Sequence, residues 1–267
     1  MLKLHDIGQA VTGLQRLLGV PATAVYDEAT QLAVSDAQRR FGLVVDGIAG
    51  PKTMEALTRG SRPARLLGDA DLKAAAEALG VPIAAVRAVN QVESRGSGYL
   101  ADGRPVILFE RHVFFRELEK AGVDAQAIAS KYPTLCAQER GGYSGGSAEW
   151  TRMELAASVS YHREAALRSA SWGLFQIMGY HASALDYASA QDFAADMALS
   201  EGQQLQAFVR FIKADSALHK ALKALKWAEF ARIYNGPAYR DNAYDLMLAR
   251  AFERFKAADP SDTKTQA

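Results

Sequence analysis

A repeat of 23 positions in the opening 60 residues constrains the fold of this part of the chain more than any other feature. Four residues of the first unit have an identical residue 23 positions later: Gln15 and Gln38, Gly19 and Gly42, Thr30 and Thr53, and Ala33 and Ala56. A unit this short cannot bury its apolar face alone, so the two units must pack against each other. Each unit has an apolar pattern of helical spacing that ends at the glycine, and a third helix is expected from Pro51 through Leu57. We therefore predict a small three-helix domain over residues 1–60.

The rest of the chain is predicted to be almost entirely helical. Residues 61–69 interrupt the periodicity with proline, glycine and arginine, which indicates a linker before a domain over residues 70–267. Asp69 is expected to cap a helix from Asp71 to Leu79. A loose polar tail is expected at the C-terminus. The other helices are expected over 82–94, 111–121, 149–169, 192–213, 217–232 and 241–257.

One segment departs from the helical pattern. Residues 98–109 contain two short apolar runs on either side of Asp102 and Gly103, which is the signal of a β-hairpin. The predicted fold class is therefore mostly α, with a small three-helix domain followed by a helical domain that contains a short β-hairpin.

The charge and the cysteine content exclude several classes of function. The 267 residues include 31 Lys and Arg against 30 Asp and Glu, so a net charge of +1 gives no general reason to expect nucleic acid or a membrane surface as partner. The single cysteine, Cys136, excludes an internal disulfide and a thiolate-rich metal site. His112, His162 and His181 lack the spacing of metal ligands, and the last two are expected at the surface or at helix caps. Neither a metal nor a cofactor is expected.

Targeting and membrane-spanning patterns are not evident in the sequence. The first residues lack the uninterrupted apolar core of a secretory signal. No uncharged apolar run approaches the roughly 18 residues that a membrane span needs. We therefore expect a soluble protein made in the cytoplasm, without stable insertion into a membrane.

Glu93 lies where an apolar helix meets a turn. Val86, Val89 and Glu93 stand at positions i, i+3 and i+7, so the carboxyl group continues the apolar stripe of its helix. A carboxyl group desolvated by apolar walls has a raised pKa and can act as a general acid toward a glycosidic oxygen. The alternative is an ordinary solvated charge or a partner for the adjacent Arg95.

Three stretches along the chain resemble the signature motifs of goose-type lysozymes and lytic transglycosylases. They are Glu93-Ser-Arg-Gly96, Ser171-Trp-Gly-Leu-Phe-Gln-Ile-Met178 and Tyr234-Asn-Gly-Pro237. A further stretch, Ile107-Leu-Phe-Glu-Arg-His-Val-Phe114, resembles the phage-type N-acetylmuramidase domain more closely. This resemblance extends over nearly all of residues 70–255.

A second resemblance concerns the N-terminal repeat. The segment from Arg40 to Leu57 is similar to the small peptidoglycan-binding domain of many cell-wall enzymes, and the match covers most of residues 5–60. It implies wall binding at the turn of Asp46 and Gly47, a turn that the first half of the repeat lacks. Two alternatives stay open: the domain is a mere adaptor, or these two residues serve only the turn.

The muramidase resemblance implies a role for each residue of the motifs. Glu93 corresponds to the catalytic acid. Gln176 offers donor and acceptor groups to sugar hydroxyls or to an N-acetyl amide, with Ser171 and Gly173 as further substrate contacts. Tyr234 can donate its hydroxyl hydrogen to the acid or to the substrate, or it only packs at the end of a helix. The following Asn-Gly pair, which begins with Asn235, lets the backbone turn close to the sugar.

Asp102 and Glu110 are the candidates for a second carboxylate. Two-acid glycosidases place the carboxyl groups about 5–5.5 Å apart for retention and roughly 6.5–9.5 Å apart for inversion. Asp102 is explained by its turn, and Glu110 either contacts the sugar, caps the next helix, or pairs with Arg111 or Arg116. The resemblance permits a single glutamate that acts first as acid and then as base, so we predict one indispensable acid. His112 is expected to line the cleft.

Together the resemblances imply a modular phage endolysin that cleaves the β-1,4 bond between N-acetylmuramic acid and N-acetylglucosamine. The alternatives are a lytic transglycosylase that forms 1,6-anhydro products, and a non-catalytic wall-binding or virion structural protein. The implied partners are the glycan strands and stem peptides of peptidoglycan, and a monomer is expected. The protein would stay in the host cytoplasm before lysis, with a holin giving access to the cell wall and periplasm.

Overall fold

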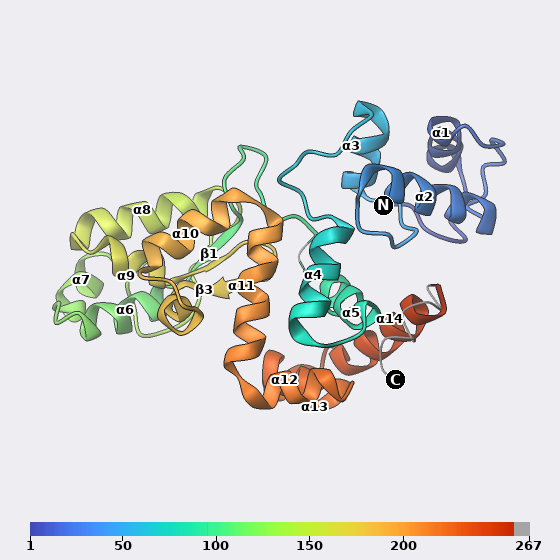
Figure 1. Cartoon of the computed structure of the whole chain (residues 1–267). Helices are drawn as coiled ribbons and strands as arrows, with labels where there is room; N and C mark the ends of the chain where they lie inside the picture. The colour runs from blue at the N-terminus through green and yellow to red at the C-terminus, as the bar shows by residue number, and fades with distance from the viewer. Residues whose placement is uncertain (95, 259–267) are drawn as a thin grey trace.

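The computed structural model describes residues 1–94 and 96–258, and the predicted mostly α fold class is confirmed (Figure 1). The α-helices are α1 Gln9–Leu18, α2 Glu28–Phe41, α3 Pro51–Arg59, α4 Asp69–Leu79, α5 Ile83–Glu93, α6 Arg111–Lys120, α7 Ala125–Lys131, α8 Ala148–Ser160, α9 Arg163–Arg168, α10 Ala190–Leu199, α11 Glu201–Ala214, α12 Ser216–Lys223, α13 Trp227–Asn235 and α14 Tyr244–Ala258. The strands and 3₁₀ helices are β1 Ile107–Phe109, β2 Ala170–Trp172, β3 Ile177–Met178, η1 Gly179–Leu185 and η2 Pro237–Arg240.

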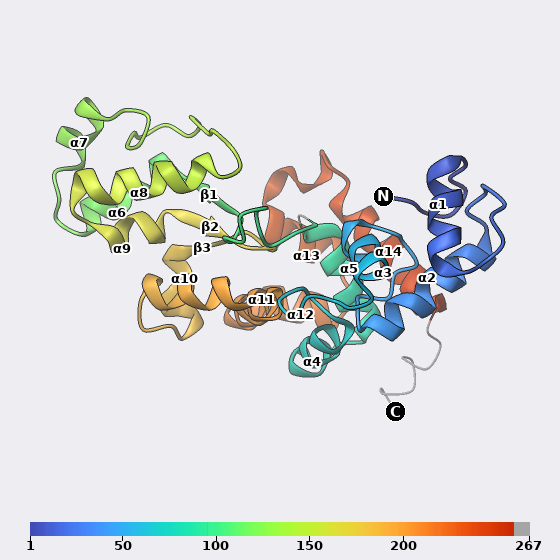
Figure 2. The ribbon, with the colours of Figure 1, turned by 90° about the horizontal axis from the view of Figure 1, so that it is seen from above.

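Helices α1–α3 form a unit at one end of the molecule, and the remaining elements form two lobes (Figures 1 and 2). One lobe holds the sheet with α6–α10, and the other holds α4, α5 and α12–α14. Helix α11 connects the two lobes, and one hydrophobic core extends through both of them. The N-terminal unit has a core of its own, centred on Leu14, Tyr26 and Val34. The chain therefore folds around two separate cores.

A buried glutamine organises the second half of the N-terminal repeat. Gln38 donates from Nε2 to the carbonyl oxygen of Ile48 at 3.0 Å and to the hydroxyl of Thr53 at 3.2 Å. Its Oε1 accepts from the main-chain N–H groups of Asp46 and Gly47 at 3.1 and 3.0 Å. One side chain therefore satisfies the polar groups of the turn that connects α2 with α3.

Gln15 has the same role in the first half of the repeat. Its Nε2 donates to the carbonyl oxygen of Val25 and to the hydroxyl of Thr30, both at 3.0 Å. Its Oε1 accepts from the main-chain N–H of Ala24 at 3.1 Å. The recurrence of glutamine and threonine in the sequence thus reflects one hydrogen-bonding pattern used twice.

The sheet is antiparallel, with the strand order β1-β2-β3. Ser171 of β2 pairs with Leu108 of β1 on one side and with Met178 of β3 on the other. Directly paired residues point to the same face of a sheet, so these three side chains share one face. The side chains of Ile107 and Phe109 point to the opposite face and are buried.

The predicted hairpin over 98–109 is only partly correct. Its arms meet at a single bridge between Tyr99 and Pro105, around the turn of Asp102 and Gly103. The second apolar run instead forms β1, which pairs with β2 from a distant part of the chain. Pairing between segments far apart in sequence is not indicated by local turn residues, so the prediction failed there.

Three of the predicted helices are each divided in two. The main chain leaves the helical conformation at Tyr161 and Leu225, which have positive φ values of 56° and 54°. At Ser200 it is extended, and the serine hydroxyl accepts from the N–H of Gln203 and thereby caps α11. The predictions that are wrong in this way are 149–169, 192–213 and 217–232.

Two further predictions for local structure need correction. Helix α4 begins at Asp69 itself, with Gly68 as its N-cap, and the carboxylate of Asp71 accepts from the N–H of Gly68 at 2.8 Å. Asp69 does not cap the helix, because its carboxylate accepts from Arg87 at 2.8 Å. Helix α7 was not predicted at all, and the tail expected at residues 260–267 lies outside the described residues.

A buried carboxylate fixes the N-terminal unit to the rest of the chain. Glu201, the first residue of α11, is fully buried. It accepts hydrogen bonds from the main-chain N–H groups of Leu67 at 2.7 Å and Gly98 at 2.9 Å. The ammonium group of Lys52 from α3 lies 2.7 Å from the same carboxylate. The N-terminal unit, the connecting segment and the start of the partial hairpin therefore converge on one side chain.

Replacing Gln38 by alanine should loosen the N-terminal unit, because several main-chain polar groups of the α2–α3 turn lose their buried partner. A buried unsatisfied group costs about 1–3 kcal/mol, so we expect a loss of about 3 kcal/mol in the unit's opening free energy. Hydrogen–deuterium exchange in α1–α3 should accelerate by about 100-fold. Gln9→Ala, a change at an exposed position of α1, should leave exchange unchanged. Equal exchange in the two variants would contradict this account of the repeat.

Candidate active site

Glu93 is the last residue of α5 and lies in a cleft of about 470 Å³. The helix ends there because Ser94 has extended backbone angles, with φ at −82° and ψ at 145°. The walls of the cleft come from the β2–β3 segment, η1, α11, α13 and the start of α14. Among the described residues that line this cleft, Glu93 is the only carboxylate.

The carboxyl group of Glu93 holds its proton unusually tightly. Burial among apolar residues raises its pKa from 4.5 to about 7. The opposing influence is a hydrogen bond of 3.0 Å from Asn235 Nδ2 to Glu93 Oε1, which favours the charged form. The expected role of Arg95 as a partner for this carboxyl group falls outside the described residues. Near neutral pH, Glu93 therefore exists in both protonation states, as a general acid and base requires.

Tyr234 forms part of an aromatic wall of the cleft. Its ring stacks on Phe230 at a centroid distance of 5.9 Å and meets Phe208 edge-on at 5.4 Å. The hydroxyl donates to the carbonyl oxygen of Phe175 at 3.3 Å. This bond connects Tyr234 to the main chain next to Gln176.

Gln176 lies in the cleft at the turn between β2 and β3, with a positive φ of 52°. A non-glycine residue pays about 1–3 kcal/mol for such a conformation, so its surroundings must hold it in place. Its Nε2 donates to the carbonyl oxygens of Gly173 at 2.8 Å and Val106 at 3.4 Å, and its Oε1 accepts from the hydroxyl of Ser171 at 3.0 Å. Both amide hydrogens are used within the protein, so the group that Gln176 can offer to a ligand is the second lone pair of Oε1.

Gly173 is required by a close approach of α11 to the sheet. It has a φ of +70°, and a Cβ atom there would lie 2.5 Å from the side-chain carbon Cδ of Gln204. Gln204 is itself buried and accepts from the N–H of Leu174 at 2.7 Å. Gly173 is buried and is not among the residues that line the cleft. The motif therefore has a glycine here because a side chain would collide with Gln204.

Glu110 and His112 form a separate cluster and do not line the cleft of Glu93. Glu110 Oε2 accepts from the hydroxyl of Tyr143 at 2.9 Å and lies 3.1 Å from Nδ1 of His112. Arg140 donates from Nε to Nε2 of His112 at 3.2 Å. Burial lowers the pKa of His112, which agrees with an unprotonated Nε2. The side chain of Glu110 makes no capping bond to α6, so that alternative from the sequence is wrong.

Asp102 lies at the exposed turn of the partial hairpin. Its carboxylate accepts from the N–H of Arg104 at 3.0 Å and from the guanidinium of the same residue at 2.6 Å. These hydrogen bonds hold the pKa of Asp102 below its usual value. Asp102 is not among the residues of the cleft and serves the turn.

His181 lines the cleft, although the sequence did not indicate it. Its imidazole is half-buried and meets Phe211 edge-on at a centroid distance of 5.0 Å. Burial and the positive charge of Arg168 lower its pKa, so the ring is neutral. The expectation of a surface or cap position was wrong for His181, although His162 does stand at the N-cap of α9. No motif or spacing in the sequence indicated this position.

Within residues 1–94 and 96–258, no group of three or more His, Cys, Asp or Glu side chains is arranged to hold a metal ion. No helix in the same part of the chain has both the length and the apolar character needed to cross a membrane. Cys136 is buried, and burial raises the pKa of its thiol to about 11.

A buried carboxyl group with a pKa near neutrality, set beside amide and aromatic side chains in a cleft, is what general acid catalysis in a lysozyme-type glycoside hydrolase requires. A model of the N-acetylmuramidase family matches residues 82–256, and a model of the peptidoglycan binding domain matches residues 5–57. The chain belongs to the N-acetylmuramidase family and has the two-domain arrangement of a modular, peptidoglycan-degrading endolysin.

A solved structure supports this assignment over the whole chain. The crystal structure of the Burkholderia AP3 phage endolysin matches with a TM-score of 0.91 and 50% sequence identity. The match covers 96% of this chain and 98% of that chain. The comparison with curated protein sequences gave no match.

The hydrogen bond from Asn235 provides a test of how the pKa of Glu93 is set. Asn235→Asp removes the donor and places a second negative charge beside Glu93, and both changes raise the pKa of Glu93. Because a general acid must be protonated, the basic limb of the pH–activity profile should move upward by about one pH unit or more. Asn242→Asp, at an exposed position before α14, should not move it. A basic limb that stays in place or moves downward in Asn235→Asp would contradict the assignment.

Proposed function

We propose that this chain hydrolyses the β-1,4 bond between N-acetylmuramic acid and N-acetylglucosamine in peptidoglycan, with Glu93 as the general acid. The observation that carries the proposal is the pKa of Glu93, which burial raises to about 7 inside the cleft. The protonated carboxyl group gives its hydrogen to the glycosidic oxygen while the bond from that oxygen to the anomeric carbon breaks. The leaving sugar then departs as a neutral alcohol.

The positive charge that develops at the anomeric carbon needs a partner, and no second carboxylate is present among the described residues of the cleft. We infer that the acetamido oxygen of the substrate stabilises this carbon. Glu93 is now a carboxylate and accepts a proton from the incoming water, whose oxygen bonds to the anomeric carbon. This step regenerates the protonated acid, so one glutamate serves as acid and then as base.

The remaining motif residues position the substrate in this proposal. Ser171 fixes the amide of Gln176, whose free lone pair can accept from a sugar hydroxyl or an acetamido N–H. Tyr234 supports the wall on the other side, and Asn235 orients the carboxyl group of the acid. Gly173 acts indirectly, since its lack of a side chain lets α11 support the turn.

A second contact for the glycan is proposed at Glu110 and His112. Glu110 follows Leu108 by two residues in extended backbone, so it continues the sheet face that carries Ser171 and Met178. Met178 of this face lines the cleft, and Ser171 holds Gln176, which lines it as well. A glycan strand bound at Glu93 could lie along this face.

The N-terminal unit is proposed to retain the enzyme on the wall. The division is a peptidoglycan-binding domain over residues 1–60, a linker over 61–69 and the catalytic domain over 70–267. Retention raises the effective concentration of glycosidic bonds at the active site. Asp46 and Gly47 are the proposed contact residues of this domain.

The relationship to a phage endolysin supports a role in host lysis. We propose that the protein acts as a monomer, stays in the host cytoplasm before lysis and reaches the peptidoglycan through a holin. The glycan strands and stem peptides of peptidoglycan are its proposed partners.

Glu93→Gln should abolish the clearing of purified cell walls, because glutamine keeps the shape of the side chain but cannot donate the proton. General acid catalysis contributes about 10²–10⁴-fold, so we expect a loss of at least about 100-fold. Glu110→Gln should cost less than about tenfold, and Asp102→Asn should cost little. Circular dichroism establishes folding in each case. If folded Glu110→Gln loses activity as completely as Glu93→Gln, the single-acid mechanism is wrong.

The absence of a second carboxylate among the described cleft residues also suits a lytic transglycosylase, in which the sugar's own 6-hydroxyl attacks the anomeric carbon. Mass spectrometry of the released muropeptides distinguishes the two reactions, because hydrolysis adds one water to each cleaved bond and the anhydro product does not. We expect reducing muropeptides with the mass of the added water. Release of 1,6-anhydro products alone would establish the transglycosylase instead.

A further inference from the structure

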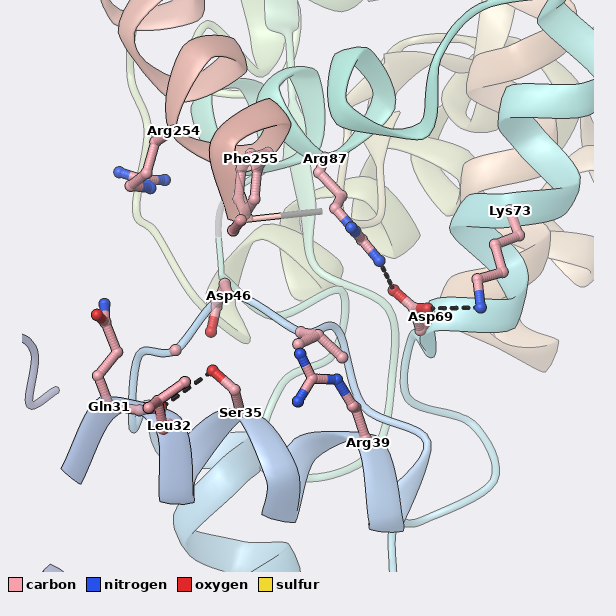
Figure 3. Close-up of a pocket in the computed structure, with 13 residues that line it drawn as sticks. Gln31, Leu32, Ser35, Arg39, Asp46, Asp69, Lys73, Arg87, Arg254 and Phe255 are labelled. Atoms are coloured by element: carbon pink, nitrogen blue, oxygen red, sulfur yellow. Dashed lines mark hydrogen bonds and ion pairs between the residues drawn. The ribbon is translucent and has the colours of Figure 1, made fainter. Parts of the chain in front are cut away.

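A second cavity, of about 340 Å³, lies between the N-terminal unit and the catalytic domain (Figure 3). One wall consists of α2 and the turn of Asp46 and Gly47. The other wall consists of α4, α5 and the end of α14. This cavity shares no lining residue with the cleft of Glu93, so it is a separate site within the size range of ligand pockets.

Two opposite charges face each other across this cavity without forming an ion pair. Asp46 lies on one wall and Arg254 on the other (Figure 3). Burial raises the pKa of Asp46, and the positive charge of Arg254 opposes this shift by favouring the carboxylate. Among the described residues, no hydrogen bond or salt bridge joins the two side chains. Arg254 donates instead to the neutral amide of Gln91. A ligand that lies between them can therefore satisfy both charges.

The carboxylate of Asp46 has capacity left for such a ligand. Its Oδ1 accepts from Gln38 Nε2 at 2.7 Å and from the N–H of Ile48 at 2.9 Å. Both bonds use the same oxygen, so they hold the carboxylate in place and leave Oδ2 for another donor. Asp46 can therefore hold the turn through Oδ1 and bind a ligand through Oδ2.

The other charges around the cavity make it positive overall. Its basic side chains are Arg39, Lys73, Arg87 and Arg254, and its acidic side chains are Asp46 and Asp69. Asp69 accepts from Arg87 at 2.8 Å and lies 3.3 Å from Lys73, so it is already paired. Arg39 is also paired, with Asp36 at 2.6 Å. The remaining excess is one positive charge, because Lys73 and Arg87 share Asp69, and an occupant with more negative than positive groups fits this balance.

We propose that this cavity binds an acidic peptide that carries a free ammonium group, with a peptide carboxylate at Arg254 and the ammonium group at Asp46. The assignment rests on the proposed function, because the stem peptide of peptidoglycan has this chemistry. Arg254 suits a carboxylate, since its guanidinium can donate two parallel hydrogen bonds. Leu32, Val45 and Phe255 supply apolar surface for the aliphatic part of the peptide.

The site is built from both domains, and this has a consequence for wall binding. A peptide that contacts Asp46 and Arg254 holds the N-terminal unit against α14. The wall is then bound by a composite surface and not by the N-terminal domain alone. The relative position of the two domains, set by Lys52 and Glu201, thereby determines the affinity.

The test uses the full chain and the synthetic tripeptide N-acetyl-L-Ala-γ-D-Glu-meso-diaminopimelate, whose only ammonium group is on the diaminopimelate, titrated by calorimetry. The peptide contains no glycosidic bond, so its binding is independent of the activity of Glu93. Arg254→Gln should weaken binding by about tenfold or more, since a charge-assisted contact is lost. Arg250→Gln, at an exposed position one turn earlier on α14 and outside the cavity, should change it by less than about twofold.

A second arm tests the ammonium contact. Acetylation of the diaminopimelate amine should weaken binding to the wild-type chain, but it should add little further loss in Asp46→Asn, which keeps the Oδ1 bonds of the turn. Absence of saturable binding, or equal binding by the Arg254→Gln and Arg250→Gln chains, would overturn the proposal. Inorganic phosphate that competes as strongly as the peptide would also overturn it, because the cavity would then bind simple anions. Loss of wall cleavage in Glu93→Gln bears on the proposed function and not on this site.

Discussion

The polar face at the start of α11 holds the active site and the domain junction in place together. Glu201 is fully buried, and its carboxylate binds the main chain of Gly98, just beyond the helix that ends at Glu93. One turn later, Gln204 packs against Gly98 and Gly173, where a Cβ atom would lie only 2.0 and 2.5 Å from its side chain. The loop after Glu93 and the turn that carries the amide of Gln176 are thus fixed by one helix. A buried carboxylate left without its partners costs about 3–5 kcal/mol, so this arrangement tolerates little change.

The contrast between buried carboxyl groups explains why Glu93 is suited to chemistry. Burial by itself raises the pKa of Glu149, but main-chain N–H groups of Gly145, Ser144 and Phe109 outweigh it, and the pKa is lowered overall. Such a group stays charged and holds the structure together. Glu93 is buried with a hydrogen bond from one amide, so desolvation prevails and its pKa rises to about 7. The same residue type therefore serves as a structural anchor or as an acid according to its donors.

Features set by local sequence patterns were predicted better than features that depend on contacts between distant segments. The repeat around Gln38 could be recognised because one hydrogen-bonding unit occurs twice, and Glu93 stood out because it is a charged residue type on the apolar stripe of its helix. Helix breaks at Tyr161 and Leu225 were missed because non-glycine residues adopt positive φ there under tertiary constraint. His181 entered the cleft through the fold of η1, which no spacing in the sequence indicates.

The pairing of β1 with β2 is another long-range contact near the site that local sequence patterns do not predict. It places the face of Leu108 and Ser171 next to the cleft, yet the two strands are far apart in sequence. The interdomain cavity likewise joins Asp46 with Arg254 from opposite ends of the chain. The motifs therefore indicated Glu93 as a candidate acid, and the structure was needed to separate its cleft from the cluster of Glu110.

The account depends most on one quantity, the pKa of the Glu93 carboxyl group. It can be measured directly by ¹³C NMR titration of the side-chain carboxyl carbon, assigned by comparison with Glu93→Gln. The account predicts a titration midpoint near 7 for this carbon, because burial disfavours the carboxylate. A midpoint near the ordinary value of 4.5 would contradict it, since the group would then be ionised at neutral pH and unable to act as the acid.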